Sequence, residues 1–179
     1  MLFRSGRRYG HERVLEEHRC WAARFADPLT AAAAPHDNDR SLNRRLTIGY
    51  VSADFREHSV AHFISPIFAT HDRSRFRIIG YDNWPRGDAI TERLRASTDE
   101  WRRIDALDDE AAANLIRADG VDILVDLSGH TLGNRLLMFA RKPAPVQASW
   151  LGYMCTTGMA AMDWRITDHH LDPPGASDG

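Results

Sequence analysis

An aspartate and two histidines follow the first strongly apolar segment of this chain. Residues 46–51 are rich in β-branched and aromatic side chains, and Asp54, His58 and His62 come soon after them. An imidazole with a pKa of about 6.5 exchanges protons at neutral pH, and a nearby carboxylate can orient it. Because ligands of open parallel sheets bind beyond the carboxyl ends of the strands, Asp54 and His58 are candidates for general acid–base chemistry.

The same residues also have structural interpretations. Asp54 could cap a turn or a helix, and His62 could be an ordinary polar residue at the start of a helix. His58 and His62 are four residues apart and could share a helical face as two metal ligands do. No third ligand occurs at a fixed spacing, so we predict no metal site.

The elements that must position these side chains alternate between strand and helix. The sequence VDILVDL at 121–127 is the clearest strand, and 59–70 has the periodicity of a helix that Pro66 kinks or shortens. This alternation predicts a Rossmann-like, doubly wound parallel sheet with right-handed crossovers, in the α/β class. The other predicted strands are 46–51, 76–81, 101–104 and 146–151, and the other helices are 88–97, an alanine-rich helix capped by Asp108 or Asp109 that stops at Gly120, and 136–140.

Three regions follow from these patterns. Residues 1–28 form a helical segment, amphipathic from 12 to 25, whose end is limited by Pro28. Residues 29–45 have no periodicity and many turn formers, so they read as a linker over the surface. The α/β domain occupies residues 46–179.

Composition excludes several classes of function. The 179 residues are 43% hydrophobic, which supports a globular core, and a net charge of −2 with dispersed basic residues argues against nucleic-acid binding. Cys20 and Cys155 form no CxxC pair, which fits a reducing, cytoplasmic setting, and no apolar run is long enough to span a membrane.

No GxGxxG, P-loop, GxSxG or HExxH motif is present. Asp126 ends a strand as a receiver-domain phosphoacceptor would, but the acidic cluster of such domains is missing.

Five stretches of the chain carry a family resemblance. They are LEEHRCWA at 15–22, LTIGYVSADFREHSVAHF at 46–63, DGVDILVDLSGHTLGNR at 119–135, ARKPAPVQASWLGYMCTTG at 140–158 and MDWRITDHHLDPPG at 162–175. In order and spacing the chain resembles the catalytic region of the O-linked N-acetylglucosamine transferases of glycosyltransferase family 41, particularly bacterial members related to the plant SPINDLY proteins.

The resemblance implies a two-lobed GT-B glycosyltransferase that is preceded by tetratricopeptide repeats. Such enzymes move a sugar from a nucleotide diphosphate to serine or threonine hydroxyls of protein acceptors, with inversion and without a metal or other cofactor. Residues 46–179 would then be the N-terminal lobe, truncated before the second lobe, and residues 1–28 would join the repeats to it. The fragment alone is not expected to be active. The donor implied is UDP-N-acetylglucosamine, with GDP-fucose as the other option.

The resemblance also suggests roles for individual residues. It implies that His18 lies in the donor pocket, although on its own this histidine reads as a structural residue of an apolar helix face. His58 and Asp54 are the candidates for the general base. The remaining implied substrate contacts are His62, Arg135, Leu151, Gly152, Tyr153 and Met154.

Departures from the family pattern leave specificity open. Met154 and Cys155 stand where the family commonly has proline and glycine, so a glycine-only backbone at Cys155 would be strained. Leu132 replaces a lysine of animal members, and Arg135 could equally be an exposed helix residue. His169 and His170 are expected at the surface. The alternative function is an inactive module that binds acceptor proteins or a partner chain.

Overall fold

A parallel sheet of six strands organises the protein. The computed structural model describes residues 11–41 and 43–171, so the predicted ends at 1–10 and 172–179 lie outside the described residues. The strands are β1 (Leu46–Ser52), β2 (Phe76–Asp82), β3 (Glu100–Arg103), β4 (Ile123–Asp126), β5 (Val146–Trp150) and β6 (Trp164–Ile166), and they lie in the order β3-β2-β1-β4-β5-β6. Every pairing in this sheet is parallel.

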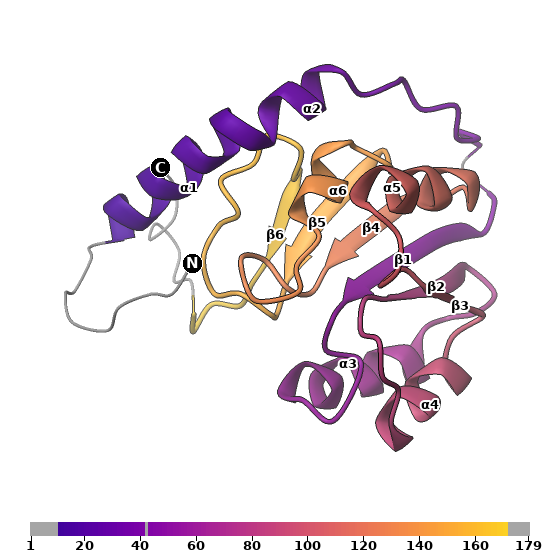
Figure 1. Ribbon diagram of the computed structural model, residues 1–179. Helices are drawn as coiled ribbons and strands as arrows, with labels where there is room; N and C mark the ends of the chain where they lie inside the picture. The colour runs from indigo at the N-terminus through magenta and orange to yellow at the C-terminus, as the bar shows by residue number, and fades with distance from the viewer. Residues whose placement is uncertain (1–10, 42, 172–179) are drawn as a thin grey trace.

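Helices cover both faces of this sheet, so the predicted doubly wound α/β class is confirmed. Figure 1 shows α1 (His11–Phe25), α2 (Asp27–Ala31), α5 (Asp109–Ala118) and α6 (Leu136–Ala140) on one side. The other side carries α3 (Ser59–Thr70) and α4 (Ala89–Ala96).

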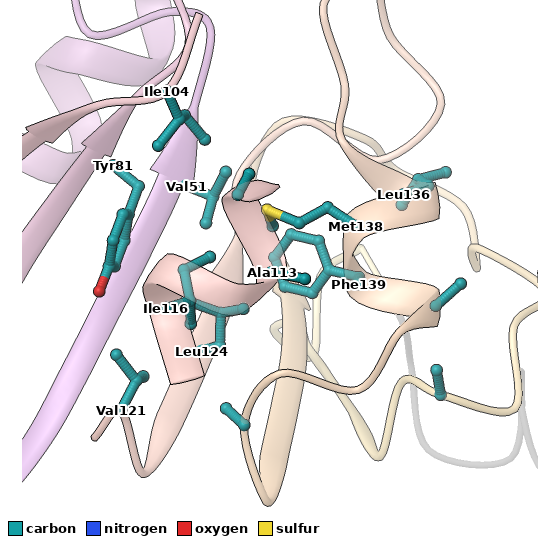
Figure 2. Close-up of a cluster of buried hydrophobic side chains, with 14 of the residues drawn as sticks. Val51, Tyr81, Ile104, Ala113, Ile116, Val121, Leu124, Leu136, Met138 and Phe139 are labelled. Carbon is teal, nitrogen blue, oxygen red and sulfur yellow. The ribbon is translucent and has the colours of Figure 1, made fainter. Parts of the chain in front are cut away.

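Alternation along the strands explains the two layers. Neighbouring side chains of a strand point to opposite faces, and Tyr50 and Val51 accordingly enter different hydrophobic clusters. The cluster under α5 and α6 contains Val51, Leu124 and Phe139 (Figure 2). The opposite cluster packs Tyr50 against Phe68 of α3, with ring centroids 5.1 Å apart. Both faces of the central strands are therefore buried.

Local sequence signals set the helix boundaries. Asp88 caps α4 by accepting the N–H groups of Ile90 and Thr91, and Asp108 caps α5 through the N–H of Ala111. Pro66 does not shorten α3, which continues to Thr70. Phe63 of this helix is 61% exposed although it is apolar.

The region predicted as a linker begins with a helix and is fastened to the sheet. Pro28 lies in the first turn of α2, where its missing N–H costs nothing, so it starts a helix after α1 has ended. Residues 32–41 and 43–45 form neither helix nor strand. Arg44 and Asn38 both bind the Asp122 carboxylate, Arg44 with two short hydrogen bonds. These bonds hold the segment at the amino end of β4.

Strand β6 is the one strand that the sequence patterns did not predict. It has three residues, it pairs with β5 alone, and Trp164 and Ile166 are exposed. A short, exposed edge strand lacks the apolar run by which buried strands are detected. Among the helices of the described residues, none is long and apolar enough to cross a bilayer.

Candidate functional site

The order of the strands fixes where a ligand would bind. The chain runs outward from β1 to β3, then returns to place β4 on the other side of β1. The loops after β1 and β4 therefore leave adjacent strands at the same edge of the sheet, which is where open α/β sheets bind ligands. They lie in contact, since a Cβ built on Gly133 would be 2.7 Å from the Cβ of Ala53. The loop after β1 carries Asp54 and His58, and the loop after β4 carries His130.

A cluster of rings gathers at this end of the sheet; we call His18, Trp21, His130 and Tyr153 the histidine cluster. His18 and Trp21 come from α1, and Tyr153 follows β5. The His18 and His130 rings are stacked, with centroids 4.2 Å apart and an interplanar angle of 13°. The Tyr153 hydroxyl lies 3.0 Å from His18 Nε2. Residues far apart in the sequence thus form one polar, aromatic surface.

Glycine makes the approach of α1 possible. Gly158 has a φ of +72°, and a Cβ built on it would lie 2.7 Å from the backbone carbon and 2.8 Å from the Cβ of His18. A side chain at residue 158 would therefore push α1 away from the cluster. The loop after β5 thus sets the position of His18 as well as that of Tyr153.

Burial keeps the histidine cluster uncharged. Burial lowers the pKa of His18, the positive charge of His130 lowers it further, and the Thr156 backbone and Glu17 oppose these effects. Burial also lowers the pKa of His130 and raises the pKa of Tyr153. At neutral pH the cluster therefore consists of neutral donors and acceptors, which suit uncharged polar groups of a ligand.

A buried carboxylate supports the loop after β4. Asp126 accepts the N–H groups of Ser128 at 3.0 Å and Gly129 at 2.8 Å. Burial raises the pKa of Asp126 to about 6, although these two bonds favour its ionised form. Both acceptor oxygens are used inside the protein, so Asp126 holds the loop that presents His130, and a phosphoacceptor role loses its support.

Asp54 and His58 are close but not hydrogen-bonded to one another. His58 Nδ1 lies 3.8 Å from Asp54 Oδ2, too far for a hydrogen bond. Arg56 donates to Asp54 Oδ1 at 2.9 Å and stacks on Trp84, with its Cζ 4.3 Å from the ring centroid. In this structure the buried Asp54 carboxylate holds Arg56 and does not orient the His58 ring.

His58 is also the N-cap of α3, and this restricts its chemistry. The Val60 N–H donates to His58 Nδ1 at 3.3 Å, so in the neutral ring the proton is on Nε2. In this tautomer His58 offers a hydrogen-bond donor at Nε2. To take a proton from an acceptor hydroxyl at Nε2, the ring would first have to release the cap.

His58→Ala is therefore expected to lower the free energy of unfolding by about 1 kcal/mol, because the first turn of α3 loses its cap. His58→Asn keeps an acceptor for the Val60 N–H and should unfold at nearly the wild-type urea concentration. Urea denaturation of the two variants checks this. Equal losses in both variants would show that the cap contributes nothing to stability. If only the alanine variant loses stability, activity should be tested in the asparagine variant.

The other predicted site residues are scattered. His62 is exposed and lies 3.5 Å from Glu57. Arg135 is neither exposed nor free for a ligand, since it binds Asp109 at 3.0 Å and the carbonyls of Ile104 and Leu107. Its guanidinium joins the start of α6 to the loop before α5. The role of Arg135 as an acceptor or phosphate contact is thus not supported by its position.

The loop after β5 holds the remaining predicted contacts. Leu151 has a φ of +69°, a left-handed conformation that a leucine rarely adopts, whereas Cys155 has no positive φ. Cys155 does not adopt the glycine-only backbone that would strain it, and the left-handed non-glycine residue of this loop is Leu151. Met154 is 76% exposed, and Gly152 packs against the Leu127 backbone. Strain at Leu151 turns the chain so that Tyr153 meets His18.

Sequence reasoning overlooked His130. It follows β4, the clearest strand of the sequence, as His58 follows β1, so the rule that selected His58 would have selected it too. No three His, Cys, Asp or Glu residues in 11–41 and 43–171 are grouped so as to hold a metal ion.

Comparisons with known proteins agree with one another. The family model described as glycosyl transferase family 41 matches residues 27–178. The chain is 41% identical over 169 residues to a protein of Solanum lycopersicum named as a probable UDP-N-acetylglucosamine–peptide N-acetylglucosaminyltransferase SPINDLY, covering 92% of this chain. It is 34% identical over 160 residues to the Arabidopsis thaliana protein similarly named but called SEC, covering 85% of this chain.

A solved structure is also similar. A mutant of the Thermobaculum terrenum O-GlcNAc transferase matches with a TM-score of 0.89 and 45% identity over 96% of this chain. The match covers 33% of that structure's chain, and this chain spans 18% of the length of the tomato relative and 16% of the SEC protein.

Proposed function

The chain belongs to glycosyl transferase family 41, and from this membership we propose that it is the first catalytic lobe of a protein O-glycosyltransferase. The observation that carries the proposal is the half-buried hydrogen bond between His18 and Tyr153, which lies at the carboxyl end of the sheet beside His130 of the loop after β4. It places fixed neutral polar groups where an open α/β sheet binds its ligand.

The proposed reaction is an inverting transfer to a serine or threonine hydroxyl. The hydroxyl attacks the anomeric carbon from the side opposite the nucleotide diphosphate, and the nucleotide diphosphate departs with the electrons of the broken bond. The hydroxyl proton passes to a general base, for which the candidates are the Asp54 carboxylate and the His58 ring once it has released its cap. In this lobe His18 and Tyr153 would hold the sugar and His58 Nε2 would donate a hydrogen bond to donor or acceptor. Groups that stabilise the departing diphosphate would come from a second lobe.

We propose UDP-N-acetylglucosamine as the donor, because the curated relatives are named for that sugar nucleotide. GDP-fucose is the alternative that an assay must include, since Met154 changes the loop beside Tyr153. We further propose that no metal takes part in the reaction and that the protein works in the cytoplasm. Its proposed partners are protein acceptors and a second lobe, and we propose that tetratricopeptide repeats precede α1.

Transfer of radiolabelled sugar tests the proposal. Each nucleotide donor is incubated with a bacterial lysate and either this 179-residue chain or the chain completed by a second lobe of the family, with and without a chelator. We expect labelled protein from the completed chain alone, at a rate the chelator does not change. Labelling by neither protein would reject transfer and favour the binding module, and loss of labelling with chelator would reject the metal-free mechanism.

A further inference from the structure

His130 is held in one orientation by contacts on several sides. Its Nε2 lies 2.9 Å from the Thr157 carbonyl oxygen, and because a carbonyl only accepts, the proton must be on Nε2. The edge of Trp21 meets its ring at 84° with centroids 5.0 Å apart, and Tyr153 meets it at 67° and 5.6 Å. The ring therefore has one tautomer and little freedom to rotate.

The face of this fixed ring lies against His18. At 4.2 Å and 13° the two imidazoles are nearly parallel, so His130 determines the plane in which the His18 ring lies. Tyr153 reaches His18 at its Nε2, on the ring edge. One partner thus fixes the plane of His18 and the other bonds in that plane.

The stack also limits the charge of the pair. Two imidazolium rings at this separation would repel each other, so the pair carries one proton charge at most. The other titratable groups that face the cluster are Glu17 of α1, which favours a charged His18, and Tyr153 with its neighbour Cys155. The carboxylate of Glu17 is exposed and paired with Arg13, so it stabilises the charged form of His18 only weakly.

We propose that His130 is a positioning residue for His18: by stacking, it holds the His18 ring neutral and in the plane in which Nε2 meets the Tyr153 hydroxyl. That the pair binds a donor sugar rests on the proposed function. The effect of His130 on the His18 ring does not depend on the proposed function, because it is a property of this chain without any ligand.

NMR titration of the His18 ring in this chain tests the positioning role directly. His130→Phe keeps a stacking ring and loses the bond to Thr157, whereas His130→Gln keeps a donor for Thr157 and loses the ring. We expect the titration midpoint of His18 to rise in both variants, because the charge of His130 is lost in each. It should rise further in the glutamine variant, toward that of an exposed histidine, because the stacked ring that covers His18 is lost as well.

His36→Gln is the matched control, because His36 also bonds a carbonyl through Nε2, that of Lys142 at 2.9 Å, outside the cluster. It should leave the His18 midpoint unmoved. An unchanged midpoint in His130→Gln, or the same midpoint in both variants, would overturn the proposal. If glutamine prevents folding, a phenylalanine variant whose His18 midpoint reaches that of an exposed histidine would overturn it as well.

Activity of the completed enzyme gives a second readout. His130→Gln should reduce transfer roughly 100-fold near neutral pH, as a small misplacement of a binding group does, and should shift the pH profile; His130→Phe should restore most of both. An activity loss in the phenylalanine variant equal to that of glutamine would count against stacking. Absence of transfer by the completed wild-type protein would reject the proposed function. The NMR titration would still decide, by itself, whether His130 positions His18.

Discussion

A chain in which Gly152 is replaced by alanine is expected not to fold. The added Cβ would lie 1.7 Å from the carbonyl oxygen of Leu127 and 2.6 Å from its carbon. Both atoms are backbone atoms of the residue that directly follows β4, so no side chain can move aside. Leu151 already has a strained left-handed backbone, so the turn cannot relax easily in the other direction. We expect a loss of more than about 4 kcal/mol, measured by urea denaturation or as a loss of soluble protein.

Gly120→Ala is the matched control for this experiment. Gly120 lies in the turn before β4, it has a φ of +66°, and a Cβ there would meet nothing within 4 Å. The alanine is expected to cost about 1 kcal/mol through backbone strain alone. If Gly152→Ala were no more damaging than Gly120→Ala, the close contact between the loops after β4 and β5 would not be a feature of the folded protein.

Loss of the His18 imidazole is expected to lower glycosyl transfer at least about 100-fold in the completed enzyme, because both the stack with His130 and the bond to Tyr153 disappear. His18→Ala also leaves the Tyr153 hydroxyl without its partner in a half-buried site, which adds a stability cost of about 1–3 kcal/mol. The rate of radiolabelled sugar transfer, with urea denaturation of the same variant, separates the two effects.

Arg19→Ala provides the control for His18, since Arg19 is the next residue of α1 and its side chain is exposed. It should leave transfer near the wild-type rate. Transfer by His18→Ala at a rate similar to that of Arg19→Ala would remove His18 from the site and with it the observation on which the proposed function depends.

Local patterns predicted the elements that have strong apolar periodicity. The predicted helix at 59–70 matches α3 at both ends. The turn after the preceding strand marks where the helix begins, and the apolar residues that recur along one face show how far it continues. Helix α2 and strand β6 have five and three residues, too few for periodicity to be seen. They depend on packing against α6 and pairing with β5, which no local pattern contains.

The site was less accessible from the sequence than the fold. The rule for strand ends selected Asp54 and His58, but only the structure shows that Arg56 takes the carboxylate and that Val60 binds the imidazole. Similarly, the family resemblance implied that Arg135 contacts a ligand, whereas three partners inside the protein occupy its guanidinium. Hydrogen-bond partners that are distant in sequence decided each of these roles.

The bond between Tyr153 and His18 joins residues 135 positions apart, and this separation has a consequence for the order of folding. Contacts between distant residues form late, because the loop they close must first be ordered. During synthesis the sheet from β1 to β4 can assemble before Tyr153 leaves the ribosome. Until then His18 of α1 lacks the hydroxyl to which it bonds. The histidine cluster, which is the proposed donor site, would then form only after this part of the sheet, so the His18–Tyr153 contact would report that α1 has docked on the lobe.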